Sequence, residues 1–442
     1  MKKKSREYTF LFLPALVVLV LTCATFIVAS FYDRQIQEYF AQGFYYKWVK
    51  IWIVFMDELG LFQFLPAIFV FCAVIWESFI HYQIKFGKKD VIRDYSWIGI
   101  FYYIVAYGFF FWIVIYQGYM RVYEDTGFGQ GIDAKLMETT TYRIVAYWII
   151  KSTEFAIMLY ATIYLRVLFH KRSDVLEQEY WVDSLKGLVY IGYCYTMIFV
   201  LKWGMGRPFY YSTIFNQIIE NEATPRGWEY SGAVMWGTGD GTQNMPYYEW
   251  WQPNHFLDNL KEWGSVSGAK DTNTTGWWNR AFPSGHTSGT FCTITIMYLF
   301  INPQKGRVLT NKKIVIIALW FLHLNSMKFA LIVYRFHWWT DLDFSTIFCI
   351  AIFPLVPKFV DKHLRWWTNL IKAKMFKKAL TGFVVEKKLG FDLYTNSEKY
   401  PVKVDFFLYG KNKQEKMDKK MKHYFHVKSE PKEVIKWQEQ PN

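Results

Sequence analysis

Long apolar runs separated by short polar segments dominate this chain. Eight of the runs approach the roughly 20 residues that a helix needs to cross a bilayer. They are 10–31, 61–82, 95–118, 144–168, 184–203, 286–303, 313–334 and 342–358. The pattern predicts an all-α fold, a polytopic membrane bundle of about eight transmembrane helices. No small-residue cleavage site follows the first run, so we expect a retained helix rather than a removed signal peptide.

The composition supports the same class of protein. Hydrophobic residues make up 52% of the chain and aromatic residues 21%. Tyr and Trp are typical of membrane interfaces, so this aromatic content disfavours a soluble helical protein. The five cysteines all fall inside predicted spans and have no metal-ligand spacing, so neither a metal site nor a disulfide framework is indicated. They are Cys23, Cys72, Cys194, Cys292 and Cys349.

The charge pattern predicts the orientation. The net charge is +14, and the N-terminal segment 1–6 is basic. Counting spans from a cytoplasmic N-terminus places loops 83–94, 169–183 and 304–312 inside, and each is basic. The tail after the last span carries 20 Lys or Arg against 10 Asp or Glu over 358–442. We therefore expect a multi-pass protein of the cell (inner) membrane with both termini cytoplasmic. No nucleic-acid partner is indicated.

Three parts of the chain follow from this topology. Residues 1–183 form an N-terminal membrane half (spans 1–4) without a site motif, in which Lys151 and Glu154 are expected to pair because lone charges in a bilayer are costly. Residues 184–358 form the predicted catalytic half, and 359–442 form a basic cytoplasmic tail that begins with an amphipathic stretch. The outside insert 209–282 is either a substrate-selecting lid or an interfacial insert without a selective role.

Three polar blocks sit at the ends of predicted spans. They are Lys202–Pro208, Pro283–His286 and His337–Asp341. Counting spans places all three at the outer face of the membrane, although they lie far apart in the sequence. We therefore expect them to converge on one site.

The residues in these blocks are typical of phosphoryl transfer, which requires a nucleophile, an acid for the leaving group and charge neutralisation. His337 is the predicted nucleophile, and Asp341, one helical turn later, can hold its other ring nitrogen. His286 is the predicted general acid. The remaining predicted roles bind phosphate: Ser284 and Gly285 at a helix N-terminus, and the cations Lys202 and Arg207. This set requires no metal and no cofactor.

The three blocks resemble the motifs of the type-2 phosphatidic acid phosphatase (PAP2) superfamily, whose site is similar to that of vanadium haloperoxidases. The second motif, Pro-Ser-Gly-His, is intact at 283–286. The first motif usually has six residues between its lysine and its Arg-Pro, whereas four separate Lys202 from Arg207. The third motif keeps the spacing of His337 and Asp341, but Ala330-Leu331 stands where the family has Ser-Arg. Lys328, one turn earlier, is our first choice for the missing phosphate-binding cation, and Arg335 is the second.

The resemblance covers about a third of the chain and implies an integral membrane phosphatase. Its substrate would be a lipid-linked phosphate of the lipid A, phosphatidate, phosphatidylglycerol phosphate or isoprenyl diphosphate type. A lipid phosphotransferase using the same phosphohistidine remains an alternative. Because the first and third motifs are altered, a degenerate protein that binds lipid phosphate without turnover remains another. The sequence does not indicate the oligomeric state.

Overall fold

A computed structural model describes residues 2–86, 97–123, 138–218, 220–221, 224–227, 244–257, 259, 280–364 and 366–367. Within these residues the secondary structure is helical, apart from an isolated β-bridge between Asn302 and Arg307. The predicted all-α fold is therefore confirmed. The predicted tail, the basic part of loop 83–94 and much of the insert 209–282 lie largely outside the described residues.

The long helices follow the apolar runs. Their bounds are α1 Lys2–Ala41, α3 Leu65–Phe86, α5 Ile98–Tyr123, α6 Thr140–Ile163, α7 Tyr180–Met205, α13 Asn311–Val333 and α14 Trp339–Ile352. Shorter helices are α2 Lys47–Gly60, α8 Tyr210–Thr213, α9 Phe215–Ile218, α11 Gly285–Ile294 and α12 Met297–Phe300. Most predicted spans thus lie within a single helix, with boundaries shifted by a few residues.

Six helices of the described chain are long and apolar enough to cross a membrane. The number is seven if the pair Trp339–Ile352 and Leu355–Leu364, bent by 42°, counts as one span. The predicted span 286–303 is divided between α11 and α12, and neither helix reaches the length of a bilayer. The predicted count of eight is therefore not confirmed.

Large apolar side chains are exposed along several of these helices. Examples are Phe31 on α1, Ile115 on α5, Tyr160 on α6 and Leu322 on α13, each exposed by more than 60%. Exposed apolar surface on this scale is unfavourable in water and favourable in lipid. The buried Lys151–Glu154 ion pair on α6, with 2.8 Å between Nζ and Oε2, confirms the predicted pairing. The chain is an integral membrane protein.

The chain divides into two compact units. The first comprises Met1–Val70, Tyr103–Ala161 and Tyr190–Phe353. The second comprises Phe71–Tyr102, Thr162–Val189 and Pro354–Asn442. In the described part of the second unit, an ion pair joins Arg166 to Glu77 at 3.0 Å. All three motif blocks belong to the first unit. The predicted boundary between membrane halves at residue 183 remains a prediction.

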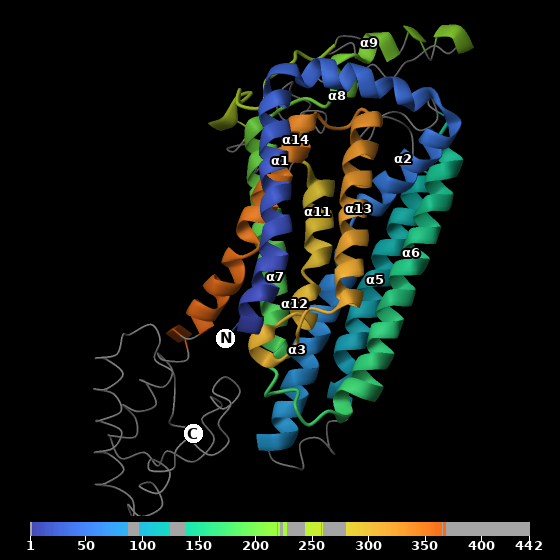
Figure 1. Cartoon of the computed structure of the whole chain (residues 1–442). Helices are drawn as coiled ribbons and strands as arrows, with labels where there is room; N and C mark the ends of the chain where they lie inside the picture. Colours follow the sequence, from blue (N-terminus) through green and yellow to red (C-terminus); the bar gives the residue numbers. More distant parts are fainter. Residues whose placement is uncertain are drawn as a thin grey trace, which may run out of the picture. The chain divides into compact units, whose positions relative to one another are not determined.

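Four helices of the first unit, α1, α11, α13 and α14, pack together near the motif blocks. α1 runs along α14, and α11 packs against both α13 and α14 (Figure 1). α1 bends at Tyr32, whose φ of −128° and ψ of 20° are not helical. The rest of α1 crosses the ends of the neighbouring helices before α2 turns back toward α13 and α11 (Figure 1). No helix was predicted over Lys47–Gly60.

Aromatic side chains fill the core at this end of the first unit. Phe44, Tyr211, Phe215 and Trp338 are all less than 2% exposed and belong to one apolar cluster. The Trp338 indole donates a hydrogen bond from Nε1 to the Pro208 carbonyl oxygen at 2.8 Å, so even this buried ring is satisfied. The cluster fixes the end of α13 and the start of α14, where the third motif block lies.

Candidate functional site

The third block lies at the start of α14. The Asp341 side chain accepts a hydrogen bond from the Trp338 backbone N–H at 3.0 Å, which caps the helix. The same oxygen, Oδ2, lies 3.3 Å from His337 Nδ1. A carboxylate in the first turn is favoured by the helix dipole, so one residue stabilises the helix and orients the imidazole. His337 Nε2 is then the nitrogen left for chemistry.

His337 is held in its neutral form. Burial lowers the pKa of His337 to about 4, opposed by the hydrogen bond to Asp341 and reinforced by the positive charge of Lys202. The side chain is only 3% exposed. A neutral imidazole carries the lone pair that a nucleophile needs, so His337 is in the required protonation state at neutral pH.

The second block forms the N-terminus of α11. Ser284 is the N-cap, and its hydroxyl oxygen accepts a hydrogen bond from the Thr287 N–H at 3.3 Å. A Cβ atom placed on Gly285 would lie 3.7 Å from Lys202 Cε, so the lysine side chain runs against this turn. The N–H groups of the first helical turn and a lysine beside them form a favourable place for an anion.

The two histidines face each other across a short distance. The ring centroids of His286 and His337 are 6.4 Å apart. His286 Nε2 lies 3.2 Å from Asp57 Oδ1, a carboxylate supplied by α2. The structure thus brings the predicted nucleophile and the predicted acid together, and adds a carboxylate that the sequence did not indicate.

The first block contributes two cations with different surroundings. Lys202 Nζ donates to the Arg280 carbonyl oxygen at 2.5 Å and lies 5.6 Å from the centre of the Phe209 ring. Arg207 is 1% exposed. Lys202 therefore lies beside the second block, whereas Arg207 is deeply enclosed.

Four groups surround the Arg207 guanidinium. It lies 2.6 Å from Asp341 Oδ1 and 3.0 Å from Asp33 Oδ2. It also donates to Thr340 Oγ1 at 2.7 Å and, through Nε, to the Tyr248 carbonyl oxygen at 3.0 Å. Arg207 thus acts on the site through Asp341, whose second oxygen contacts His337.

Backbone hydrogen bonds connect the three blocks. The Ala281 N–H donates to the Arg207 carbonyl oxygen at 2.9 Å, and the Ser284 N–H donates to the Asp341 carbonyl oxygen at 3.2 Å. The Ser345 hydroxyl donates to the carbonyl oxygens of both Ser284 and Asp341. Segments more than 50 residues apart in the sequence are therefore held in fixed register.

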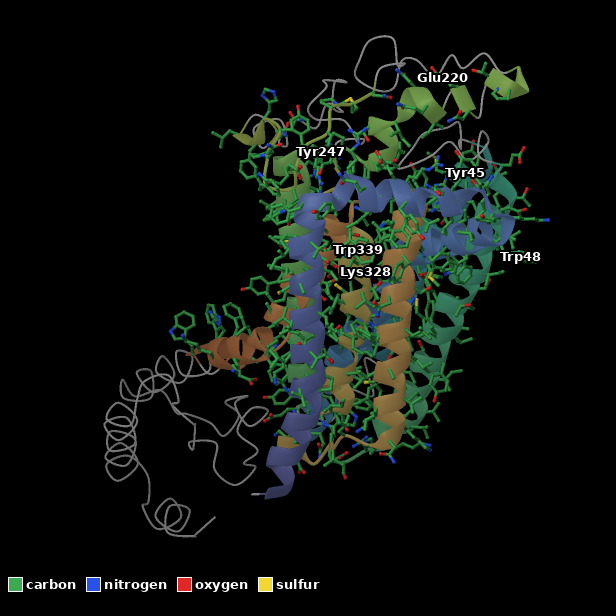
Figure 2. The ribbon with its side chains drawn as sticks, turned by 45° about the horizontal axis from the view of Figure 1, so that its top comes forward. Tyr45, Trp48, Glu220, Tyr247, Lys328 and Trp339 are labelled. Carbon is green, nitrogen blue, oxygen red and sulfur yellow. The ribbon has the colours of Figure 1, made fainter. Side chains whose placement is uncertain are left out.

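Lys328 does not join the histidines. Its Nζ lies 2.5 Å from Asp343 Oδ1, and it is 5.5 Å from the centre of the Trp339 ring (Figure 2). Residues two apart on a helix point to different sides, so Asp343 holds Lys328 on another face of α14 from Asp341. The Thr25 hydroxyl also donates to Asp343, at 2.6 Å.

Arg335 lies against two aromatic rings rather than beside the histidines. It has a positive φ of 66° at the end of α13, and its guanidinium lies 5.1 Å and 5.2 Å from the ring centres of Phe44 and Tyr45. These contacts direct it toward the segment between α1 and α2. Neither of the two cations predicted for the third motif, Lys328 and Arg335, is therefore brought to His337.

Arg280 is a cation beside the site that sequence reasoning missed. Its guanidinium carbon lies 3.4 Å from the centre of the Trp203 ring. Trp203 directly follows Lys202 in the sequence. Burial lowers the pKa of Arg280 to about 10, which leaves it charged at neutral pH. The signal was present, since Arg280 lies three residues before Pro283. Asp33 and Asp57 carried no motif signal.

Comparison with known proteins agrees with this geometry. Residues 183–365 match the model of the PAP2 superfamily. The chain is also 30% identical, over 367 residues, to an uncharacterized protein of Mycoplasma capricolum subsp. capricolum. This match covers 78% of the chain and 88% of the relative. No solved structure matches the chain. On the family match and the three converging motif blocks, residues 183–365 form a PAP2 superfamily domain.

Proposed function

We propose that this chain is a membrane phosphatase that removes phosphate from a lipid-linked phosphate through a phosphohistidine at His337. The observation that carries the proposal is the facing pair of imidazoles, 6.4 Å between ring centroids, one oriented by Asp341. Lys202 and the start of α11 lie beside them. A site at the end of an apolar bundle favours an amphiphilic substrate over a soluble sugar phosphate.

The proposed reaction has two steps. His337 Nε2 attacks phosphorus in line, a P–N bond forms, and the P–O bond to the lipid breaks. The electron pair of that bond stays on the lipid oxygen, which His286 protonates. Neutral His286 then takes a proton from water, the resulting hydroxide attacks the phosphohistidine, and inorganic phosphate leaves with His337 restored. Asp341 keeps its hydrogen bond to Nδ1 throughout and stabilises the charged ring.

Charge neutralisation in this proposal comes from Lys202, the Ser284 hydroxyl, the Gly285 N–H and Arg280. Arg207 supports the reaction by holding Asp341, since its donors already meet two carboxylates, a hydroxyl and a carbonyl. We place the site at the outer face of the membrane with both termini cytoplasmic, as the basic loops suggest.

The function is tested with purified protein in mixed micelles. Phosphatidate, phosphatidylglycerol phosphate, an isoprenyl diphosphate and lipid A are each supplied, and inorganic phosphate is measured with EDTA or vanadate. We expect phosphate release from at least one lipid, unchanged by EDTA and inhibited by vanadate, which mimics the trigonal-bipyramidal transition state. Loss with EDTA that Mg²⁺ restores would instead indicate a metal-dependent enzyme.

Two other outcomes contradict hydrolysis. With diacylglycerol present as acceptor, transfer of labelled phosphate to it without phosphate release would indicate a phosphotransferase. Binding of lipid phosphate without release or transfer would indicate a degenerate member of the superfamily, consistent with its altered first and third motifs.

Alanine variants identify the cation that replaces the missing arginine. Arg280→Ala is expected to lower kcat by about 10²–10³-fold, the loss typical of one transition-state charge partner. Lys328→Ala and Arg335→Ala are expected to retain most of the activity because their contacts lie elsewhere. Steady-state kinetics on one lipid phosphate decides the comparison. A larger loss at Lys328 or Arg335 would show that substrate binding rearranges the ends of α13 and α14.

A further inference from the structure

α2 brings two features against one edge of the His286 ring. Asp57 Oδ1 lies 3.2 Å from Nε2. A Cβ atom placed on Gly60 would lie 2.0 Å from Cδ2 of the same ring, 2.8 Å from Cγ and 3.1 Å from Nε2. Asp57 and Gly60 are three residues apart and share a helix face. The imidazole therefore rests on α2 with its Nε2–Cδ2 edge, in a space that only a glycine leaves open.

Contacts on two sides hold α2 in this place. Beyond its end, the Gln63 side-chain amide donates to Thr290 Oγ1 at 2.8 Å, and Thr290 is four residues after His286 on α11. On the other side, Glu58 accepts from Arg121 and Arg143, at 2.8 Å and 2.9 Å. Asp57 is 5% exposed and Glu58 1%. Asp57 therefore contacts His286, whereas Glu58 forms ion pairs with arginines of α5 and α6.

The ring geometry assigns the two nitrogens. Nδ1 is opposite the Nε2–Cδ2 bond in an imidazole, so it points away from α2. Nε2 faces the Asp57 carboxylate at 3.2 Å, a charge contact rather than an aligned hydrogen bond, so Nδ1 is the nitrogen that can exchange a proton with the substrate. A leaving-group acid must carry its proton on the nitrogen that faces the substrate before the P–O bond breaks, so the orientation of the ring matters for this step.

We propose that Asp57 is a positioning residue for the leaving-group acid, and that α2 through Asp57 and Gly60 orients His286 so that Nδ1 delivers the proton. This inference rests on the proposed function. In the first step the proton moves from His286 Nδ1 to the lipid oxygen as the P–O bond breaks, and Asp57 does not accept a proton. The site would then contain two carboxylate–imidazole pairs, Asp341 with the nucleophile and Asp57 with the acid.

The test uses leaving groups that differ in their need for an acid. An alkoxide such as that of diacylglycerol leaves poorly unless protonated, whereas p-nitrophenolate is a weak base and leaves without help. Single-turnover release of the leaving group is measured with enzyme in excess, from dioleoyl phosphatidate and from p-nitrophenyl phosphate. Under this condition only the first step contributes. His286→Ala provides the pattern expected when the acid is removed.

Asp57→Asn is expected to slow release from phosphatidate by on the order of 10²-fold, toward the lower end of what a general acid contributes. Release of p-nitrophenolate is expected to change less than about threefold, since that step needs no acid. Gly60→Ala is expected to show the same selective loss, because its Cβ displaces the ring without changing any charge. Asp57→Glu, which keeps the carboxylate, should recover part of the rate.

Two controls separate positioning from folding. Glu58→Gln removes the adjacent carboxylate of the same helix and should affect both substrates equally, through stability alone. Gly108→Ala, on α5, has no atom within 4 Å of the added Cβ and should leave both rates unchanged. Equal losses on both substrates in Asp57→Asn, or none, would overturn the inference while the phosphatase function stands. Failure of the wild type to release a leaving group from p-nitrophenyl phosphate and from every lipid phosphate of the panel would instead remove the proposed function and this inference together.

Discussion

His337→Ala is expected to reduce lipid phosphate hydrolysis by on the order of 10⁶-fold, the loss typical of removing a group that forms the covalent intermediate. No other described imidazole lies where it could replace His337, since His286 is held against α2 by Asp57. Phosphate release by the purified variant measures the effect. Labelling with a radioactive lipid phosphate, followed by acid treatment, detects the acid-labile phosphohistidine in the wild type.

His363→Ala serves as the matched control, because His363 is exposed and its Nδ1 contacts only the Phe359 carbonyl oxygen among the interactions described. It should retain wild-type rates. An acid-labile phosphoprotein that persists in His337→Ala would reassign the nucleophile, and normal turnover by this variant would contradict the mechanism as a whole.

Arg207→Met is expected to destabilise the protein by about 3–5 kcal/mol, the cost of removing one partner from a buried ion pair. The loss arises because Asp33 and Asp341, 3% and 0% exposed, are left facing each other without the intervening cation. The free energy of unfolding in detergent measures the effect, and phosphate release should fall with it because Asp341 loses its position.

A second substitution tests the cause. Asp33→Asn added to Arg207→Met removes one of the two stranded charges and should restore part of the stability. Arg207→Lys keeps the positive charge but cannot bind two carboxylates through a planar fork, so an intermediate stability is expected. Equal stability of Arg207→Met and the wild type would show that the buried network contributes nothing net.

The motif blocks could be predicted because each combines unusual residues at fixed spacing near the end of an apolar run. Pro283–His286 and His337–Asp341 were recognisable on this basis. Their partners could not be recognised in the same way. Asp57 lies in a stretch that resembles an interfacial segment, and it meets His286 only after α2 turns back toward α11. The sequence position of a single carboxylate does not indicate a contact with a residue more than 200 positions away.

The choice of Lys328 illustrates a different limit. Spacing along a helix predicts which residues share a face of that helix, and Lys328 does lie one turn before the vacant position 331. It does not predict which neighbouring helix that face meets. Lys328 forms an ion pair with Asp343 on α14. The Thr25 hydroxyl and the Trp339 indole both donate hydrogen bonds to the same carboxylate of Asp343. The divided span 286–303 was missed for a related reason, since hydropathy does not detect the break between α11 and α12.

The bend of α1 at Tyr32 has a consequence for how the protein is made. α1 leaves the ribosome before α14, yet Asp33 just beyond its bend binds Arg207, 174 residues later, and the Thr340 N–H, 307 residues later. Until α14 has entered the membrane, this carboxylate lacks its Thr340 partner, and contacts so distant in sequence form slowly. The contacts around Asp33 are therefore complete only when both α1 and α14 are in place. A chain that ended before residue 337 would lack His337 and Asp341, and with them the proposed nucleophile and the carboxylate that orients it.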